Sequence, residues 1–285
     1  MPLARLLRFF SNPARFFLRE RLGVSLGGPE KALLNTEPFV VDGLDRYLLC
    51  QKLLEWKLAG KDLAGAYPLV RGMGLLPHGA GGECAYEEIR LGVEDFAMRL
   101  RKTVGAESSW EMELDETLEG FHLTGKVSEL YGTALVHYRQ ARAKGRDHLL
   151  LWLRHLALTC GDTPQITQSI LLTRDGCWTY GVLPGARKLL AAYLELYLEG
   201  LRRPLPFFPE SSYSFARELL VEGKGESGAI EKAATAWRGD QYRRAESDEP
   251  HYQTCFGNVD PLGETFQELA LKVYGPLLEI QKKIG

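Results

Sequence analysis

The sequence lacks the features that mark membrane proteins, secreted disulfide scaffolds and zinc proteins. No apolar run approaches the roughly 18 residues that a membrane-spanning helix needs, and arginines interrupt the apolar start MPLARLLRFFSNPARFF, which argues against a signal peptide. The five cysteines lie far apart without a C-x-x-C pair, which argues against zinc, iron–sulfur clusters and structural disulfides. We therefore expect a cytoplasmic protein that makes no contact with a membrane.

The motifs of nucleotide-dependent and hydrolytic enzymes are also missing. No G-x-x-x-x-G-K-[ST] loop occurs, because GAGGE has no lysine and VEGKGESG places its lysine between the wrong glycines. G-x-S-x-G and H-E-x-x-H are absent as well. His148 and His155 are seven residues apart and could share one helix face, but without a third ligand we expect packed or exposed histidines. The sequence therefore predicts neither an ATP site nor a bound cofactor.

A large charge of one sign is absent too. The 35 lysines and arginines nearly balance the 37 aspartates and glutamates and leave a net charge of −2. No field of the whole molecule attracts a polyanion, so any contact with nucleic acid must come from a local patch. The sequence has two candidate DNA-binding patches, in which cations outnumber acids: Arg5, Arg8, Arg15, Arg19 and Arg21 near the start, and Arg139, Arg142, Lys144 and Arg146 further on. The alternative for each patch is an ordinary solvated face.

Hydrophobic periodicity predicts a definite order of helices and strands. Asn12 can cap a helix that has Pro13 at its first position, where a missing N–H costs nothing. The expected helices cover 3–10, 13–22, 43–59, 83–102 and 146–159, and the expected strands cover 110–115, 121–127, 134–139, 166–173 and 177–180. After Pro184 we expect helices only, apart from the connector RRPLPFFPESSY.

The central order of these elements is helix, three strands, helix, strand. Short connections containing Gly120 and Gly132 favour an antiparallel meander for the three strands. This order resembles the core of the restriction-endonuclease-like, or PD-(D/E)xK, nucleases. We therefore expect a mixed α/β (α+β) fold with that core and flanking helices at both ends. Residues 1–75 would form an N-terminal helical segment, 76–183 the nuclease-like core and 184–285 a mainly helical extension, together one compact unit and a fragment of a longer chain.

The resemblance to these nucleases also implies where metal ligands should lie. In that family an Asp ends the second strand, and the third strand carries (D/E)-x-Lys, whose residues share one face because side chains alternate along a strand. The matching positions here are Ser128 on the second strand and His137 and Arg139 on the third. Mg²⁺ prefers carboxylate oxygens, which none of these three residues supplies, and Arg139 keeps its proton. Glu129 could restore a carboxylate only if a bulge turned it to the same face.

Several motifs in register carry a second resemblance. They are FFSNPARFFLRERLGV, TEPFVVDGLDRYLL, GLLPHGAGGE, LTGKV, LWLRHLALTC, LLTRDGCW and EGLRRPLPFFPESS. In this order they resemble the C-terminal domain of the gamma chain of exodeoxyribonuclease V, the RecC family of the RecBCD helicase–nuclease. The resemblance spans nearly all of the chain. It implies a nuclease-like domain that has lost its metal site, lies at the fork where duplex DNA enters, contributes a pin that parts the strands and meets the beta chain. Glu83 stands where active relatives carry a metal-binding His.

These observations lead to one expected function and two alternatives. The expected function is non-catalytic DNA binding, strand separation and scaffolding in double-strand-break repair by recombination, with double-stranded or forked DNA and the beta (RecB) chain as partners and the alpha (RecD) chain as a further candidate. Tyr131, Phe207 and Phe208 are wedge candidates, with ordinary core packing as the alternative for each. One alternative function is a divergent nuclease that uses Glu83, Glu87 or Glu129. The other is a protein-interaction domain that never touches DNA.

Overall fold

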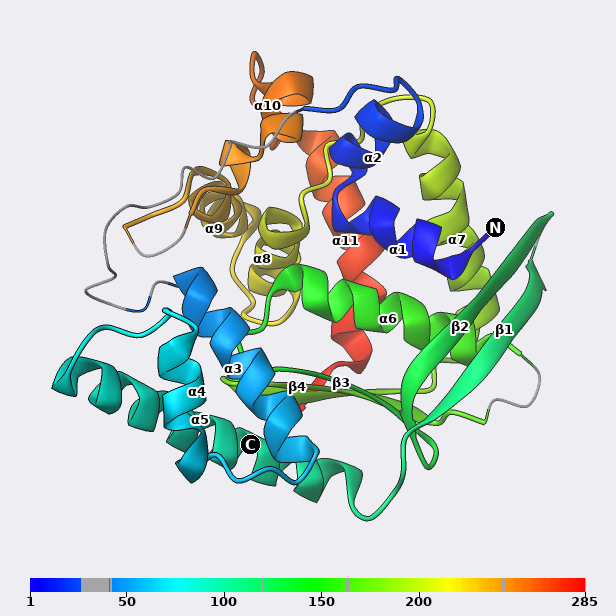
Figure 1. The fold of residues 1–285 in the computed structure, drawn as a ribbon. Coiled ribbons are helices and arrows are strands. Elements are labelled where there is room, and N and C mark those ends of the chain that lie inside the picture. The colour runs from blue at the N-terminus through cyan, green and yellow to red at the C-terminus, as the bar shows by residue number, and fades with distance from the viewer. Residues whose placement is uncertain (27–40, 42, 119, 162–164, 242–243, 285) are drawn as a thin grey trace.

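The computed structural model describes residues 1–26, 41, 43–118, 120–161, 165–241 and 244–284. Its centre is a six-stranded sheet with helices on both faces (Figure 1). The strands are β1 (Trp110–Leu118), β2 (Phe121–Tyr131), β3 (Ala134–Arg139), β4 (Gln168–Thr173), β5 (Gly176–Gly181) and β6 (Lys282–Ile284). They follow one another in the sheet in sequence order, and all neighbours are antiparallel except the parallel pair β3–β4. The expected antiparallel meander β1–β2–β3 is confirmed.

The helices surround this sheet in sequence order. They are α1 (Leu3–Ser11), α2 (Pro13–Glu20), α3 (Gly43–Leu58), α4 (Tyr67–Gly72), α5 (Ala80–Val104), α6 (Gly145–Thr159), α7 (Ala186–Gly200), α8 (Pro209–Leu220), α9 (Glu226–Arg238), α10 (Pro250–Phe256) and α11 (Glu264–Ile280), with short 3₁₀ turns η1 (Ala64–Ala66) and η2 (Glu246–Asp248). The cap expected at α2 is present, because Asn12 Oδ1 accepts the Arg15 N–H at 2.8 Å. The short helix α4 is an element that the periodicity did not indicate.

Alternation along the strands divides the core into two layers. Leu135 and Leu171 pack on one side, with α6 and the helices α1, α7 and α11. Val136 and Ile170 pack on the other side, with α3 and α5. Figure 1 shows α6 on one face of β3 and β4 and the pair α3 and α5 on the opposite face. A third cluster joins α8, α9, α10 and α11. Burial of these apolar faces, at about 25 cal/mol per Å² removed from water, is the main force that holds the layers together.

The end of the described chain corrects one expectation. Only helices were expected after Pro184, but Lys282–Ile284 forms β6, which pairs antiparallel with β5. Three exposed residues are too short for a periodic signal, so only the partner strand reveals this element. The start of the chain reaches the same sheet, because Met1 accepts the Thr124 N–H at 2.9 Å. The sheet therefore draws on all three of the expected segments.

None of the helices among the described residues is both long and apolar enough to cross a membrane.

Candidate nucleic-acid interface

A β-bulge lies at the position where the nuclease pattern has its first carboxylate. Trp110 pairs with Leu130 and Met112 with Val127, so Ser128 and Glu129 together face the single residue between them on β1. Glu129 has φ +66°, the only positive φ at a non-glycine residue in the described chain. The bulge is the condition under which Glu129 could leave the face expected from simple alternation. The structure meets that condition.

The bulge joins Glu129 to the third strand. His137 Nδ1 lies 3.1 Å from Glu129 Oε2, and Arg154 Nη1 of α6 lies 3.7 Å from the same oxygen. His137 therefore lies beside a carboxylate, and a cation of α6 completes the group. Ser128 is exposed and makes no side-chain hydrogen bond to another described residue.

Arg139 also makes an internal contact. Its Nη1 lies 2.9 Å from both carboxylate oxygens of Asp147, on the first turn of α6, and its guanidinium lies 5.2 Å from the centre of the Tyr47 ring. Asp147 is 8% exposed at its side chain, so the charge that Arg139 neutralises is nearly buried. Arg139 and His137 both face the α6 side of the sheet, as their two-residue spacing predicts. The guanidinium of Arg139 is engaged by Asp147 and is not free to hold a phosphate.

The glutamates of α5 lie away from this group. Glu83 is exposed on the first turn of α5, and Glu87 pairs with Arg90 at 2.7 Å, whereas α5 packs on the sheet face opposite to α6. The structure therefore does not bring Glu83 together with His137 and Arg139. No three His, Cys, Asp or Glu side chains within the described ranges are grouped so that they could hold a metal ion.

The second arginine patch forms an exposed cluster at the carboxyl ends of β3 and β4. The Arg174 N–H donates to the Ala141 carbonyl at 3.0 Å, and the Ala143 N–H donates to Asp175 Oδ1 at 2.9 Å, so the β3–α6 loop is fixed to the β4–β5 turn. This adds one cation that the sequence analysis missed, although it lies in the motif LLTRDGCW. We call the four residues the loop cluster: Arg142, Lys144, Arg146 and Arg174. All are exposed, and none makes an ion pair within the described part of the chain.

Acidic side chains cap the helix that begins beside this cluster. Glu210 accepts the N–H groups of Gly145 and Arg146 at 2.8 and 3.2 Å, at the positive end of α6. Glu246 caps α8 in the same way, accepting from the backbone of Glu210 and Ser211 at 3.1 and 2.8 Å. Burial raises the pKa of Glu210, and burial together with the charge of Glu210 raises the pKa of Glu246 to about 7. The end of α6 is thus already occupied, and an anion would meet the side chains of the loop cluster.

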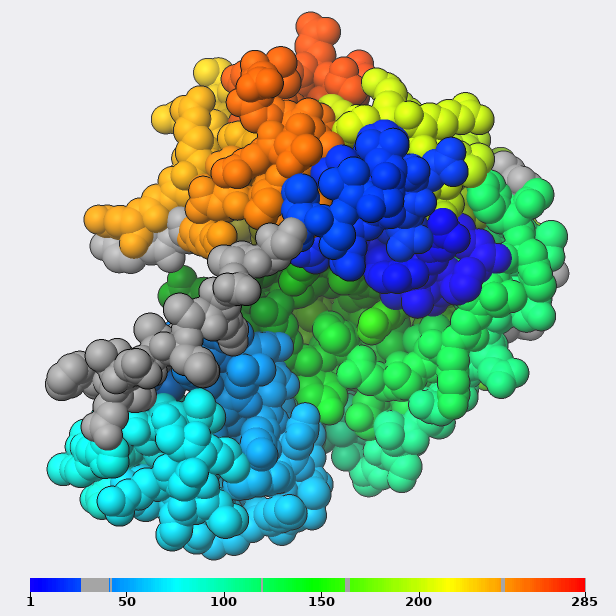
Figure 2. All heavy atoms as spheres, turned by 45° about the horizontal axis from the view of Figure 1, so that its top comes forward, coloured from blue at the N-terminus to red at the C-terminus, as the bar shows by residue number. Residues whose placement is uncertain are grey.

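The arginines of the first patch divide into two pairs. Arg5 lies 3.7 Å from Glu20 and stacks over Phe16, and Arg15 lies 3.4 Å from Glu249, where α2 packs beside α10 (Figure 2). Arg8 and Arg19 are exposed and make no ion pair with another described residue. Two of the four predicted DNA-binding residues here are therefore engaged within the fold, and two are available to a ligand.

The structure corrects two of the three wedge candidates. Phe207 is 2% and Phe208 0% exposed. Phe207 packs with the rings of Phe10 and Tyr274, and Phe208 packs at 4.2 Å from the Trp237 ring in the helical cluster. Neither ring can enter a DNA duplex from these positions, because a core side chain cannot reach solvent without unfolding its surroundings. Tyr131, at the β2–β3 turn, is half-buried and stays a prediction.

The two histidines of α6 are packed residues, as the sequence analysis expected. His148 is 2% exposed, stacks on Tyr213 and accepts at Nδ1 from the Gln281 amide at 2.9 Å. His155 is 0% exposed and sits 2.8 Å from Ser169 Oγ and 2.9 Å from the Gly181 carbonyl. Burial lowers the pKa of His148 to about 3 and the pKa of His155 to about 4. Both rings are therefore neutral at pH 7.

These observations define a class: a mixed α/β domain whose nuclease-type positions pair with one another and whose unpaired cations gather at the carboxyl ends of two parallel strands. Comparison with known proteins gives the family. A family model described as the RecC C-terminal domain matches residues 1–220, so the chain belongs to the family of RecC C-terminal domains. The resemblance drawn from the seven sequence motifs is thereby confirmed.

The curated relatives carry the same name. The RecBCD enzyme subunit RecC of Escherichia coli (strain K12) is 28% identical over 274 residues, which cover 92% of this chain and 24% of the relative. The RecC subunit of Buchnera aphidicola subsp. Acyrthosiphon pisum is 24% identical over 265 residues, 87% of this chain and 24% of the relative. That of Mycolicibacterium smegmatis is 28% identical over 229 residues, 75% of this chain and 20% of the relative. The chain thus spans about a quarter of the length of these relatives.

Proposed function

We propose that this domain is a non-catalytic DNA-handling and scaffolding module of a RecBCD-type helicase–nuclease, acting in the cytoplasm on double-stranded or forked DNA. The observation that carries the proposal is the loop cluster. Four exposed cations without ion pairs in the described chain stand at the carboxyl ends of β3 and β4, where open α/β sheets commonly bind ligands. Phosphates on such a cluster release counterions, which supplies affinity without reading sequence.

The side chains at the nuclease-type positions support a role without cleavage. Arg139 pairs with Asp147, and His137 pairs with Glu129, so the groups that stand in for metal ligands neutralise one another. The strand order, with one parallel pair between helices on both faces, supports a restriction-endonuclease-like core. We propose that this core keeps the nuclease architecture and uses its surface to hold DNA.

The proposal assigns the energy for strand separation to partner chains. The sequence has no phosphate-binding loop, so work on the duplex must come from elsewhere. The relatives are named as subunits of the RecBCD enzyme, which supports assembly with the beta (RecB) chain and, as a second candidate, the alpha (RecD) chain. Tyr131 at the β2–β3 turn is the remaining wedge candidate for the point where strands part.

The test is binding of a labelled forked duplex between 50 and 200 mM salt, followed by fluorescence anisotropy. For the original chain, four phosphate contacts give a log–log salt slope of about −3 to −4. Replacing the three loop cations (Arg142→Gln, Lys144→Gln and Arg146→Gln) should flatten the slope by about 3 and weaken binding at 50 mM salt at least about tenfold. Incubation with Mg²⁺ or Mn²⁺ should leave the DNA intact.

A matched control has the same charge change elsewhere. Lys188→Gln, Arg202→Gln and Lys232→Gln alter exposed cations that make no ion pair within the described chain and lie outside both candidate patches. This triple variant should keep the original slope. Equal losses in the two triple variants would mean that net charge alone governs binding and that the loop cluster has no special role.

A further inference from the structure

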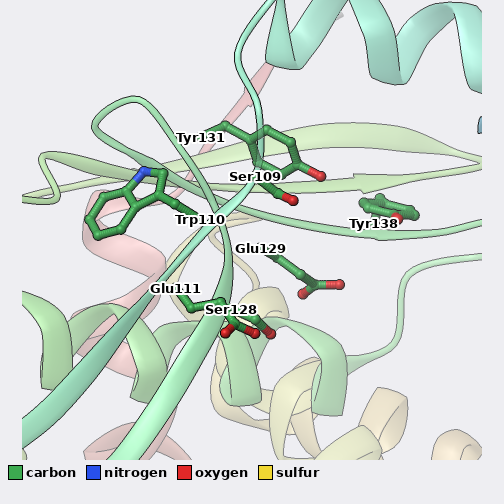
Figure 3. Close-up of a pocket in the computed structure, with 7 residues that line it drawn as sticks. All are labelled: Ser109, Trp110, Glu111, Ser128, Glu129, Tyr131 and Tyr138. Carbon is green, nitrogen blue, oxygen red and sulfur yellow. The ribbon is translucent and has the colours of Figure 1, made fainter.

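A cavity of about 580 Å³ opens beside the bulge, away from the loop cluster. It lies where β1, β2 and β3 meet, and Figure 3 shows its lining: Ser109, Trp110, Glu111, Ser128, Glu129, Tyr131 and Tyr138. Three aromatic rings contribute its apolar surface. The other four residues contribute hydroxyl and carboxylate groups, and no lysine, arginine or histidine is part of the lining. The cavity is therefore built of hydrogen-bond acceptors and flat apolar walls.

Each carboxylate of the cavity has an oxygen that its neighbours leave unused. His137 and Arg154 both contact Oε2 of Glu129. Lys126 pairs with Oε2 of Glu111. No contact within the described residues uses either Oε1. The single indole donor in the lining is engaged, since Trp110 Nε1–H donates to the Gly132 carbonyl at 3.2 Å. A ligand that offers several N–H groups would therefore find two carboxylate oxygens to accept them.

The negative charge reaches the aromatic walls. Burial raises the pKa of Tyr131, and the charge of Glu129 raises it further. The pKa of Tyr138 is raised by burial first, and then by Tyr131, Glu129 and Glu55. A phenol whose ionisation is opposed in this way lies in a negative potential, which favours a cation over a phosphate.

The backbone keeps Glu129 at the cavity against its own preference. A non-glycine residue at φ +66° costs roughly 1–2 kcal/mol relative to ordinary backbone, and a glycine would adopt this conformation without strain. The bulge that turns Glu129 toward His137 also places its side chain in the cavity lining.

We propose that this cavity binds the guanidinium of an arginine side chain presented by a protein partner. A guanidinium is planar, carries five N–H donors and stacks on aromatic rings, so it matches two free carboxylate oxygens flanked by Trp110, Tyr131 and Tyr138. A lysine offers a compact ammonium that cannot use both carboxylates and a ring face in one plane. A DNA phosphate would meet two carboxylates here, so this site is separate from the loop cluster.

The test follows the Trp110 indole N–H signal in ¹H–¹⁵N spectra of the 285-residue chain, assigned with Trp110→Phe. The probe is Nα-acetyl-arginine methylamide, and the expected dissociation constant is on the order of millimolar, as suits a single side chain. The citrulline derivative, which has the same shape without charge, should bind at least about fivefold more weakly. Glu129→Gln and, independently, Glu111→Gln should each weaken the arginine probe by about the same factor.

Glu113→Gln is the matched control, because Glu113 is an exposed carboxylate on the same strand as Glu111 and does not line the cavity. It should leave binding unchanged, and the spectra of all variants should otherwise superimpose. Equal binding of the citrulline derivative, or equal losses in Glu113→Gln and in both cavity variants, overturns the proposal. A single-stranded oligonucleotide that moves the Trp110 signal at lower concentration than the arginine probe would also overturn it, in favour of an unstacked base.

Discussion

Replacing Arg139 with alanine is expected to lower the free energy of unfolding by about 3 kcal/mol. The substitution removes the cation whose Nη1 lies 2.9 Å from both oxygens of Asp147, a side chain that is 8% exposed. An unpaired carboxylate in that position loses its partner without regaining water. The ring of Tyr47 also loses a stacked guanidinium. Urea unfolding at pH 7, followed by far-UV circular dichroism, measures the loss.

Arg142→Ala is the matched control, three residues along the chain. Arg142 is exposed and makes no ion pair with any described residue, so its replacement should change stability by less than about 0.5 kcal/mol. The double variant Arg139→Ala/Asp147→Asn should be more stable than the sum of its single variants, since the amide removes the charge that Arg139 balanced. Additive losses, or a stable Arg139→Ala that binds forked DNA poorly, would instead assign Arg139 to the DNA surface.

The contrast between Arg139 and Arg142 also shows how far the sequence predicts the site. Strand periodicity places His137 and Arg139 on one face, and the structure confirms that both face the α6 side. Periodicity cannot show that Asp147, eight residues later, starts a helix that returns over this face. An arginine that is charged in the sequence is thus neutralised by a contact that only the tertiary fold creates.

The bulge at Glu129 marks a second limit. Alternation assigns opposite faces to neighbouring residues of a strand, and Glu129 escapes this rule because two residues of β2 face one residue of β1. No glycine marks the position, although its φ is positive. The same limit applies to β6, whose three exposed residues form a strand only because β5 offers an unpaired edge. Long, strongly patterned elements such as α5 and α6 were predictable, since each carries its own apolar face.

Lowering the pH from 6.5 to 4.5 is expected to destabilise the fold through His148 and His155. Their pKa values in the fold are about 3 and about 4, below the ordinary 6.5, so the unfolded chain takes up two protons that the folded chain refuses. Each histidine therefore removes about 1.4 kcal/mol of stability per pH unit in this window. The contribution is complete above pH 6.5 and is lost as the pH falls toward 4.

Glu246 acts in the opposite direction and offers a way to isolate the effect. Its pKa of about 7 lies above the ordinary 4.5, so its neutral form stabilises the fold below pH 4.5, and this stabilisation is lost as the pH rises through 7. Glu210, which faces it across the start of α8, also has a raised pKa and acts with it. Between pH 6.5 and 4.5 these carboxyl groups return part of the stability that the histidines remove.

Glu246→Gln should therefore make the fold more sensitive to acid while stabilising it at pH 8. The amide oxygen can still accept the N–H groups of Glu210 and Ser211, and no charge is buried at high pH, so the gain at pH 8 should be about 1–3 kcal/mol. Between pH 6.5 and 4.5 the variant should lose about 2–3 kcal/mol more than the original chain. Urea unfolding at pH 8, 6.5, 5.5 and 4.5 gives both values. Glu231→Gln, at an exposed glutamate, should leave the profile unchanged, and parallel profiles for Glu246→Gln and the original chain would show that Glu246 is ionised at pH 6.5 and that its burial does not oppose its charge.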